Sequence, residues 1–187
     1  DMGLSTATIQ MEDLDDYLFS SIFFVNLILG FLLTFVFALM APLVSWFFND
    51  DRLFLVTLIS STTFFIASLS SQLLALLKRS MNFKLVFKSQ IISGFSGILV
   101  SILLAYLDFG YWALVWGPIA SGLLMTIYLI FVFQWFPKKP IWDSRIKRLL
   151  DFGKHMTFFE IINFFSRNLD NILIDRFFGS SSLGIYN

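Results

Sequence analysis

Charged residues are scarce in this chain, and cysteine is absent. Asp, Glu, Lys and Arg make up 14% of its 187 residues, well below the ~25% that is typical of soluble domains. The formal net charge is zero, so nothing in the charge balance indicates nucleic acid as a partner. Without cysteine, the chain offers neither a disulfide nor a thiolate metal site.

The motifs of common enzyme classes are also missing. The sequence contains no G-x-x-x-x-G-K-[ST] loop to hold the phosphates of a nucleotide. Its His, Asp and Glu residues do not have the spacing of metal ligands, and no nucleophile–base pair exceeds what chance supplies. We therefore expect no catalytic residue, no cofactor and no metal, and predict that the protein is not an enzyme.

Long uncharged runs dominate what is present. Hydrophobic residues make up 57% of the chain, and phenylalanine alone occurs 25 times, which is more apolar surface than a soluble fold of this size can bury. The runs are continuous and do not alternate as the strands of a β-barrel do. At ~20 apolar residues per crossing, they predict an all-α integral membrane protein, a polytopic helical bundle. The four predicted spans lie near 19–47, 53–77, 89–107 and 112–135.

The basic residues predict an orientation in the membrane. Segment 78–88 carries four Lys or Arg residues and segment 136–150 carries five, whereas the two intervening loops hold only Arg52. Lys and Arg concentrate in cytoplasmic loops. We therefore expect 78–88 and 136–150 to be cytoplasmic, and residues 48–52 and 108–111 to face outward. Segment 142–152 mixes basic and apolar residues, as either a short interfacial helix or a water-exposed linker would.

A polar stripe distinguishes the last predicted helix, residues 154–178. At about 100° per residue, six polar side chains fall within an arc of about 140°, and apolar residues fill most other directions. A loop would not sort its residues in this way. The six residues are Glu160, Asn163, Arg167, Asp170, Asn171 and Asp175.

Three readings of this stripe remain open. Ionisable residues at membrane depth are costly, and they normally face a water-filled cavity or the bundle interior. The stripe is therefore typical of a transport pathway, with Arg167, Asn163 and Asn171 as substrate-binding residues. On that reading Glu160, Asp170 and Asp175 are candidates for ion coupling. An interfacial helix that never crosses the bilayer and a structural ion pair between helices are the alternatives.

Other features favour plain packing over chemistry. Gly94, Gly97 and Ser101 in the third span, and Gly117 with Ser121 in the fourth, predict close helix approach. Asn26 and Gln72 are lone polar residues in apolar spans and are typical of hydrogen bonds between helices. His155, the single histidine, is better read as an interfacial polar residue than as a proton relay. The tryptophans fall near predicted helix ends, as an aromatic belt requires: Trp46, Trp112, Trp116, Trp135 and Trp142.

The stretch SRNLDNILIDRFFGSSSLGIYN, residues 166–187, resembles a run found in the polysaccharide flippases of the multidrug/oligosaccharidyl-lipid/polysaccharide exporter superfamily. That run reads roughly N-x-D-x-x-L-I-G-[RK]-x-x-G-x-x-x-L-G-x-Y, and Asp175 stands where the family usually has glycine. LLKRSMNFK and DFGYWALVWG are similar to motifs of the colanic-acid-type exporters. The residues that match the run are Asn168, Asp170, Leu173, Ile174, Arg176, Gly179, Leu183, Gly184 and Tyr186.

The resemblance implies a transporter built from two six-helix bundles around a central cavity. Because the chain begins at Asp1 and ends just after a polar segment, we expect an internal fragment of such a protein. Residues 1–150 then belong to the first bundle, with 136–150 as a cytoplasmic linker, and residues 151–187 hold the first helix of the second bundle. The implied location is the bacterial inner membrane.

The resemblance also implies a function. Members of the family are thought to move undecaprenyl-diphosphate-linked oligosaccharide units from the cytoplasmic to the outer leaflet by alternating access. The expected partners are this lipid-linked substrate, membrane lipids and other polysaccharide-assembly proteins. A membrane-embedded transferase acting on polyprenyl-phosphate sugars is the alternative, but it needs an ionisable cluster in an aqueous loop, and these loops are short. A structural assembly subunit is a third alternative, against which the intramembrane charges argue.

Overall fold

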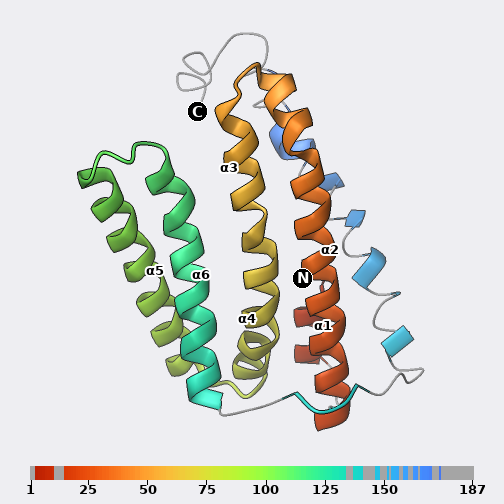
Figure 1. Cartoon of the computed structure of the whole chain (residues 1–187). Helices are drawn as coiled ribbons and strands as arrows, with labels where there is room; N and C mark the ends of the chain where they lie inside the picture. Colours follow the sequence, from red (N-terminus) through yellow and green to blue (C-terminus); the bar gives the residue numbers. More distant parts are fainter. Residues whose placement is uncertain are drawn as a thin grey trace.

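The computed structural model describes residues 3–10, 15–133, 137–140, 146–147, 151, 153–155, 158–159, 162–163, 165–169 and 173. Within these residues the structure is helical, with no strand. Figure 1 shows long helices standing side by side, running alternately up and down, with a short helix beside the first long one. The helices are α1 (Leu4–Gln10), α2 (Asp16–Phe48), α3 (Arg52–Ser60), α4 (Thr62–Arg79), α5 (Phe83–Tyr106) and α6 (Trp112–Phe133).

The four predicted spans are confirmed. Among the described residues, four helical stretches are long and apolar enough to cross a membrane, with α3 and α4 together forming the second. Each turn between them is closed by a residue in the left-handed region of backbone space: Asn49 (φ 54°), Met81 (φ 55°) and Asp108 (φ 59°). Asn and Asp tolerate this conformation better than most residues do, and the short connections keep successive helices antiparallel.

One boundary differs from the prediction. Segment 78–88 was expected to be a connection between spans, but only residues 80–82 connect α4 to α5. Lys84 and Lys88 lie inside the first turns of α5, where they are exposed. An uncharged run marks the part of a helix in the hydrocarbon, whereas the helix itself continues into the interface, because a lysine stem reaches the headgroups while its backbone stays helical.

The interior is small, and most apolar side chains point outward. Within the described part of the chain, three buried clusters hold the helices together: one where α1 meets α2 around Leu18 and Ile22, one around Leu73 and Leu129, and one around Ile66. Large side chains on the outer surface stay open, with Phe95 66% and Phe131 76% exposed. A soluble protein does not expose so much contiguous apolar surface, and a lipid environment removes its cost. The arrangement is that of a polytopic membrane protein.

Ion pairs lie at both ends of the helical bundle, and one of them joins two segments that are distant in the sequence. Lys138 Nζ lies 2.7 Å from Asp16 Oδ2, which places the segment after α6 beside the start of α2, and this hydrogen bond raises the pKa of Lys138. At the opposite end, Arg52 donates to both carboxylate oxygens of Asp50 and lowers the pKa of that carboxyl. The helices run alternately up and down, so the ends of α4 and α6 lie at one end of the bundle and the ends of α2 and α5 at the other, as the predicted pairing of loops requires. Which side is cytoplasmic stays a prediction.

Thiol labelling tests that orientation. These 187 residues contain no cysteine, and both Ser80 and Asn49 are exposed, so a cysteine introduced at either position is the only thiol in this part of the protein. We expect Ser80→Cys to react with a membrane-impermeant maleimide only after the cytoplasmic face is opened, and Asn49→Cys to react in intact cells. Labelling of Ser80→Cys from outside would reverse the orientation.

The α5–α6 hairpin shows the close approach that small residues permit. An added Cβ at Gly97 would lie 2.9 Å from the Gly117 carbonyl oxygen, and Ser101 Oγ donates to the Ala113 carbonyl across the same contact at 3.0 Å. The prediction for Gly97, Ser101, Gly117 and Ser121 is confirmed. It is wrong for Gly94, where an added Cβ would meet nothing within 4 Å.

This difference gives a matched pair of substitutions three residues apart on one helix. Gly97→Ala should lower the free energy of unfolding by about 1–3 kcal/mol, because a backbone carbonyl must move to admit the methyl group. Gly94→Ala should change it by less than about 0.5 kcal/mol, as an open surface position does. Reversible unfolding in mixed micelles measures both variants, and equal effects would contradict the close contact.

Candidate functional site

The second span changes locally at Ser61, where α3 ends and α4 begins, although Ser61 keeps helical backbone angles (φ −58°, ψ −28°). Here Phe64 N–H bonds the Ser61 carbonyl oxygen at 3.2 Å, a tighter turn than the α-helix makes. The hydroxyls of Ser61, Thr62 and Thr63 each donate to the carbonyl three residues earlier, at 2.6–2.7 Å. Hydroxyls that bond the backbone of the preceding turn in this way often bend a helix. The four consecutive hydroxyl residues 60–63 are the sequence signal for this local change, which the apolar pattern alone did not predict.

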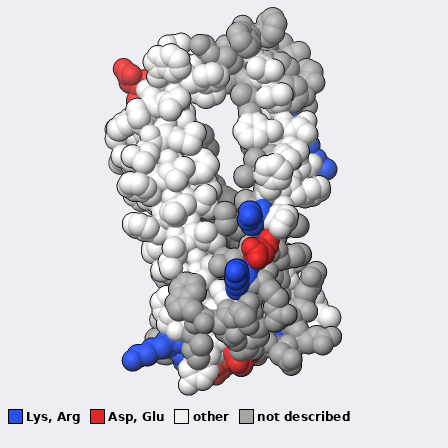
Figure 2. Space-filling view, turned by 90° about the vertical axis from the view of Figure 1, so that its right-hand side faces the viewer, with Lys and Arg blue, Asp and Glu red and all other residues white. Residues whose placement is uncertain are grey.

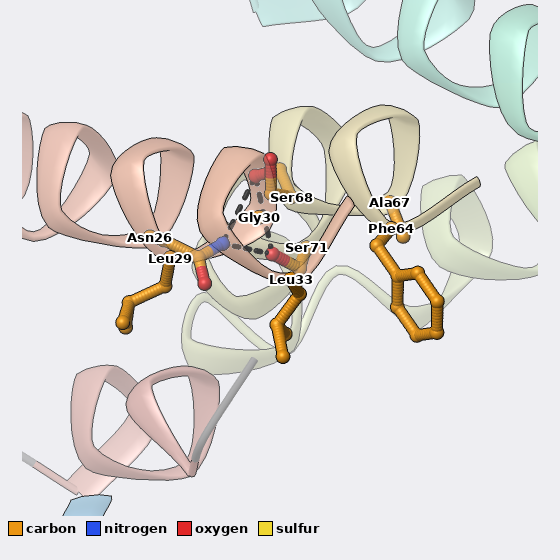
Figure 3. Close-up of a pocket in the computed structure, with 8 residues that line it drawn as sticks. All are labelled: Asn26, Leu29, Gly30, Leu33, Phe64, Ala67, Ser68 and Ser71. Carbon is orange, nitrogen blue, oxygen red and sulfur yellow. Dashed lines mark hydrogen bonds between the residues drawn. The ribbon is translucent and has the colours of Figure 1, made fainter. Parts of the chain in front are cut away.

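A pocket that contains the side chain of Asn26 lies between this span and α2. Asn26 of α2 donates from Nδ2 to the Ser68 carbonyl oxygen at 2.9 Å and to Ser71 Oγ. The carbonyl accepts only, so the amide nitrogen must face it, and Figure 3 shows the amide oxygen directed away from Ser68 and Ser71. At Gly30 an added Cβ would lie 2.4 Å from the Ser68 side chain, so the absence of a side chain lets α2 reach α4.

The pocket has a volume of about 240 Å³ and a mostly apolar lining. Its lining residues are Asn26, Leu29, Gly30, Leu33, Phe64, Ala67, Ser68 and Ser71. The expectation that Asn26 forms hydrogen bonds between helices is confirmed. Sequence reasoning missed its partners, the Ser68 carbonyl oxygen and the Ser71 hydroxyl, which lie three residues apart on one face of α4.

Gln72 joins α4 to the short helix α1. Its side chain is fully buried, with Oε1 3.0 Å from Thr8 Oγ1, which also lies 2.8 Å from the Leu4 carbonyl oxygen. Gln72 Nε2 has no hydrogen-bond partner among the residues that the structure describes. Arg79 donates to the Thr8 carbonyl oxygen at 3.0 Å and strengthens the same contact. Gln72 is therefore also a link between helices, as predicted, and α1 is held to the C-terminal half of α4.

The predicted polar helix lies only partly within the described residues. Every residue described between 151 and 173 is helical. Asn163 and Arg167 are both exposed, and their spacing of four places them on one face. Asn168 is half-buried and has an interaction partner. The other predicted site residues fall outside the described part of the chain: Glu160, Asp170, Asn171 and Asp175.

Figure 2 looks onto the side of the molecule where the blue segments of Figure 1 lie. Basic and acidic side chains gather at a few points on this face, and the surface is hollowed above the central group. Near the start of the segment, His155 is exposed, and its Nδ1 lies 2.7 Å from the Asp151 carbonyl oxygen, one helical turn back. Further along the same helical segment, Arg167 is an exposed cation, and its neighbours Phe165 and Leu169 are exposed apolar residues.

No group of three or more His, Asp or Glu side chains that could hold a metal ion occurs within the described residues. The described charges of α2 to α6 lie at or near helix ends, and the hydrocarbon-length stretches between them are uncharged. The described tryptophans, Trp46, Trp112 and Trp116, lie near the ends of α2 and α6, as predicted. Trp135 and Trp142 lie outside the described residues.

The fold defines a polytopic α-helical membrane protein. The chain belongs to a family described as "Polysaccharide biosynthesis protein", whose family model matches residues 1–187. The resemblance seen in the motifs is thereby confirmed at the level of the family. No solved structure matches the chain significantly.

Three curated relatives match the chain. It is 28% identical over 193 residues to "Teichuronic acid biosynthesis protein TuaB" of Bacillus subtilis (strain 168), covering 100% of this chain and 39% of the relative. It is 25% identical over 191 residues to "Uncharacterized membrane protein in cps region" of Klebsiella pneumoniae, with the same coverage. It is 32% identical over 113 residues to "Succinoglycan biosynthesis transport protein ExoT" of Rhizobium meliloti (strain 1021), covering 60% of this chain and 23% of the relative. The chain therefore spans 39% of the length of the first two relatives.

Proposed function

We propose that the protein moves undecaprenyl-diphosphate-linked oligosaccharide repeat units from the cytoplasmic to the outer leaflet of the bacterial inner membrane, for surface polysaccharide synthesis. Membership of a polysaccharide biosynthesis family supports this proposal, as does the word "transport" in the name of one relative. The observation that carries it is Arg167, a cation in a helical, largely apolar segment of a chain whose other described helices keep their charges at or near their ends.

The physical demands of such a substrate match the residues of the polar stripe. A diphosphate accepts paired hydrogen bonds from a guanidinium, which is the role we assign to Arg167. Asn163 and Asn171 offer amide donors and acceptors to sugar hydroxyls. The prenyl tail needs lipid access, which the exposed apolar faces of the helices supply.

Alternating access needs a span that bends, and in this proposal the second span bends at Ser61, where hydroxyls bond the backbone carbonyls of the preceding turn. The hydroxyls that satisfy its carbonyls can change partners without leaving a backbone group unpaired in lipid. Thr34 of α2 lies within hydrogen-bond distance of the Ser61 carbonyl oxygen, at 3.1 Å, so a bend here is linked to α2. In this proposal Glu160, Asp170 and Asp175 couple transport to an ion.

Depletion of the protein from a polysaccharide-producing cell separates transport from the transferase alternative. A blocked transporter leaves complete lipid-linked repeat units to accumulate, whereas a missing transferase leaves units that lack a sugar. We expect mass spectrometry of the extracted lipids to show complete units in excess over undepleted cells. Accumulation of a truncated unit, restored to full length by the protein, would overturn the proposal in favour of the transferase.

A further inference from the structure

One face of α5 is complementary to an anionic phospholipid, because it is basic at one end and apolar along the rest of its length. Lys84 and Lys88 lie in the first two turns, and both are exposed. Beyond them the same face is apolar and open, with Ile91 52%, Phe95 66% and Ile98 60% exposed. These positions follow one another at spacings of three and four, so they form one continuous stripe on the helix.

The lysines of this stripe are not explained by helix stability. Within the described part of the chain neither lysine forms an ion pair, and the first turn of α5 contains no acidic residue. A cation near a helix N-terminus is disfavoured by the helix dipole. Lys78 and Arg79, by contrast, lie in the last turn of α4, where the dipole favours them. The ammonium groups of Lys84 and Lys88 are therefore available to an anionic partner from outside the described helices.

Apolar side chains beside the lysines place this end of α5 at the membrane surface. Met81 is 73% exposed, Phe83 58% and Phe87 64%. Lysines interleaved with exposed aromatic and aliphatic side chains are typical of segments at the boundary between headgroups and acyl chains. Figure 1 shows the first turn of α5 at the same end of the molecule as the last turn of α6 and the start of α2.

We propose that Lys84 and Lys88 bind the phosphate of an anionic glycerophospholipid, whose acyl chain lies along Ile91, Phe95 and Ile98. The two lysines are one turn apart, so both ammonium groups reach one headgroup. Basic residues at the cytoplasmic ends of membrane helices attract anionic lipids, and here the apolar track beneath them adds contact with the lipid tail. This binding does not depend on the transport activity proposed above.

Lipid retention tests this site with a matched control. The protein is purified in nanodiscs of phosphatidylcholine and phosphatidylglycerol and transferred to detergent, and the lipids that remain bound are counted by mass spectrometry. Lys84→Gln with Lys88→Gln should lower retained phosphatidylglycerol about tenfold relative to phosphatidylcholine. Lys78→Gln with Lys139→Gln removes the same charge from two other exposed positions and should change retention less than twofold.

Two further arms keep the result decisive. Lys84→Arg with Lys88→Arg should retain the lipid, because the charge persists. Lys88→Gln alone removes one of the two charges and should show an intermediate loss; this single variant replaces the double variant if the latter folds poorly. Equal losses in the α5 pair and the control pair would overturn the proposal in favour of diffuse surface charge. Displacement of phosphatidylglycerol by equimolar undecaprenyl diphosphate, but not by inorganic phosphate at matched ionic strength, would assign the site to the transported lipid and also overturn it.

Discussion

Replacing Arg167 with alanine should abolish transport while the protein remains inserted in the membrane. Arg167 lies about 15–20 Å from either end of the predicted 154–178 helix, at ~1.5 Å per residue, too deep for its side chain to reach an interface readily. Asp170 and Asn171, three and four residues on, are expected to satisfy only part of its five donors. The remaining donors would bind the diphosphate, and their loss should slow transport about 10²-fold or more, at ~1.5–3 kcal/mol for each charged hydrogen bond.

A conservative variant separates charge from geometry at this position. Arg167→Lys keeps the positive charge but loses the planar fork, so it should retain partial activity. The Arg167→Ala protein should remain well expressed, because Asp170 can take up a proton once it is unpaired. Transport at the wild-type rate by Arg167→Ala would rule out the binding role. Loss of expression in both variants would indicate the structural ion pair.

Neutralising Glu160 and Asp170, two of the three carboxylates of the stripe, should remove the pH dependence of transport. Burial in a low-dielectric site favours the protonated form of a carboxyl, so Glu160 and Asp170 would exchange protons as the cavity alternates between the two sides. The variant carrying Glu160→Gln and Asp170→Asn keeps the side-chain shapes and removes the titration. Its transport rate should become flat with pH in vesicles where the wild type responds to an imposed gradient.

The matched control is Asp151→Asn, an exposed carboxylate near the start of the same segment. It should leave the pH profile unchanged. An unaltered pH dependence in the double variant would exclude proton coupling through these two residues, and a changed profile in Asp151→Asn would locate the effect at the membrane surface.

The spans were predictable because a bilayer imposes a length on uncharged runs. The starts and ends of α2 and α6 lie within three residues of the predicted spans. The start of α5 was not predictable in the same way, since lysine stems let a helix continue past the hydrocarbon. The junction between α3 and α4 at Ser61 was also missed, because an apolar run does not reveal where hydroxyls bond the backbone of the preceding turn.

The candidate site, too, was predictable only where local helix geometry decides the positions of its residues. A helix has a fixed angular period, so Asn163 and Arg167 could be placed on one face from their spacing, and both are helical and exposed in the structure. No comparable rule predicts from the sequence which residues of a distant segment will form hydrogen bonds with a given side chain. Asn26 was recognisable as a polar residue in an apolar span, but its bonds to Ser68 and Ser71 depend on the close approach that Gly30 allows.

The most direct test of the account is the leaflet position of a lipid-linked oligosaccharide in sealed vesicles containing the purified full-length protein. A membrane-impermeant reagent that modifies the glycan reports the exposed fraction over time. The account predicts that glycan placed in one leaflet becomes accessible on the other side in wild-type vesicles, but not in Arg167→Ala or protein-free vesicles, and that its mass stays unchanged. Equal rates in all three preparations, or a glycan altered in mass by the protein, would contradict it.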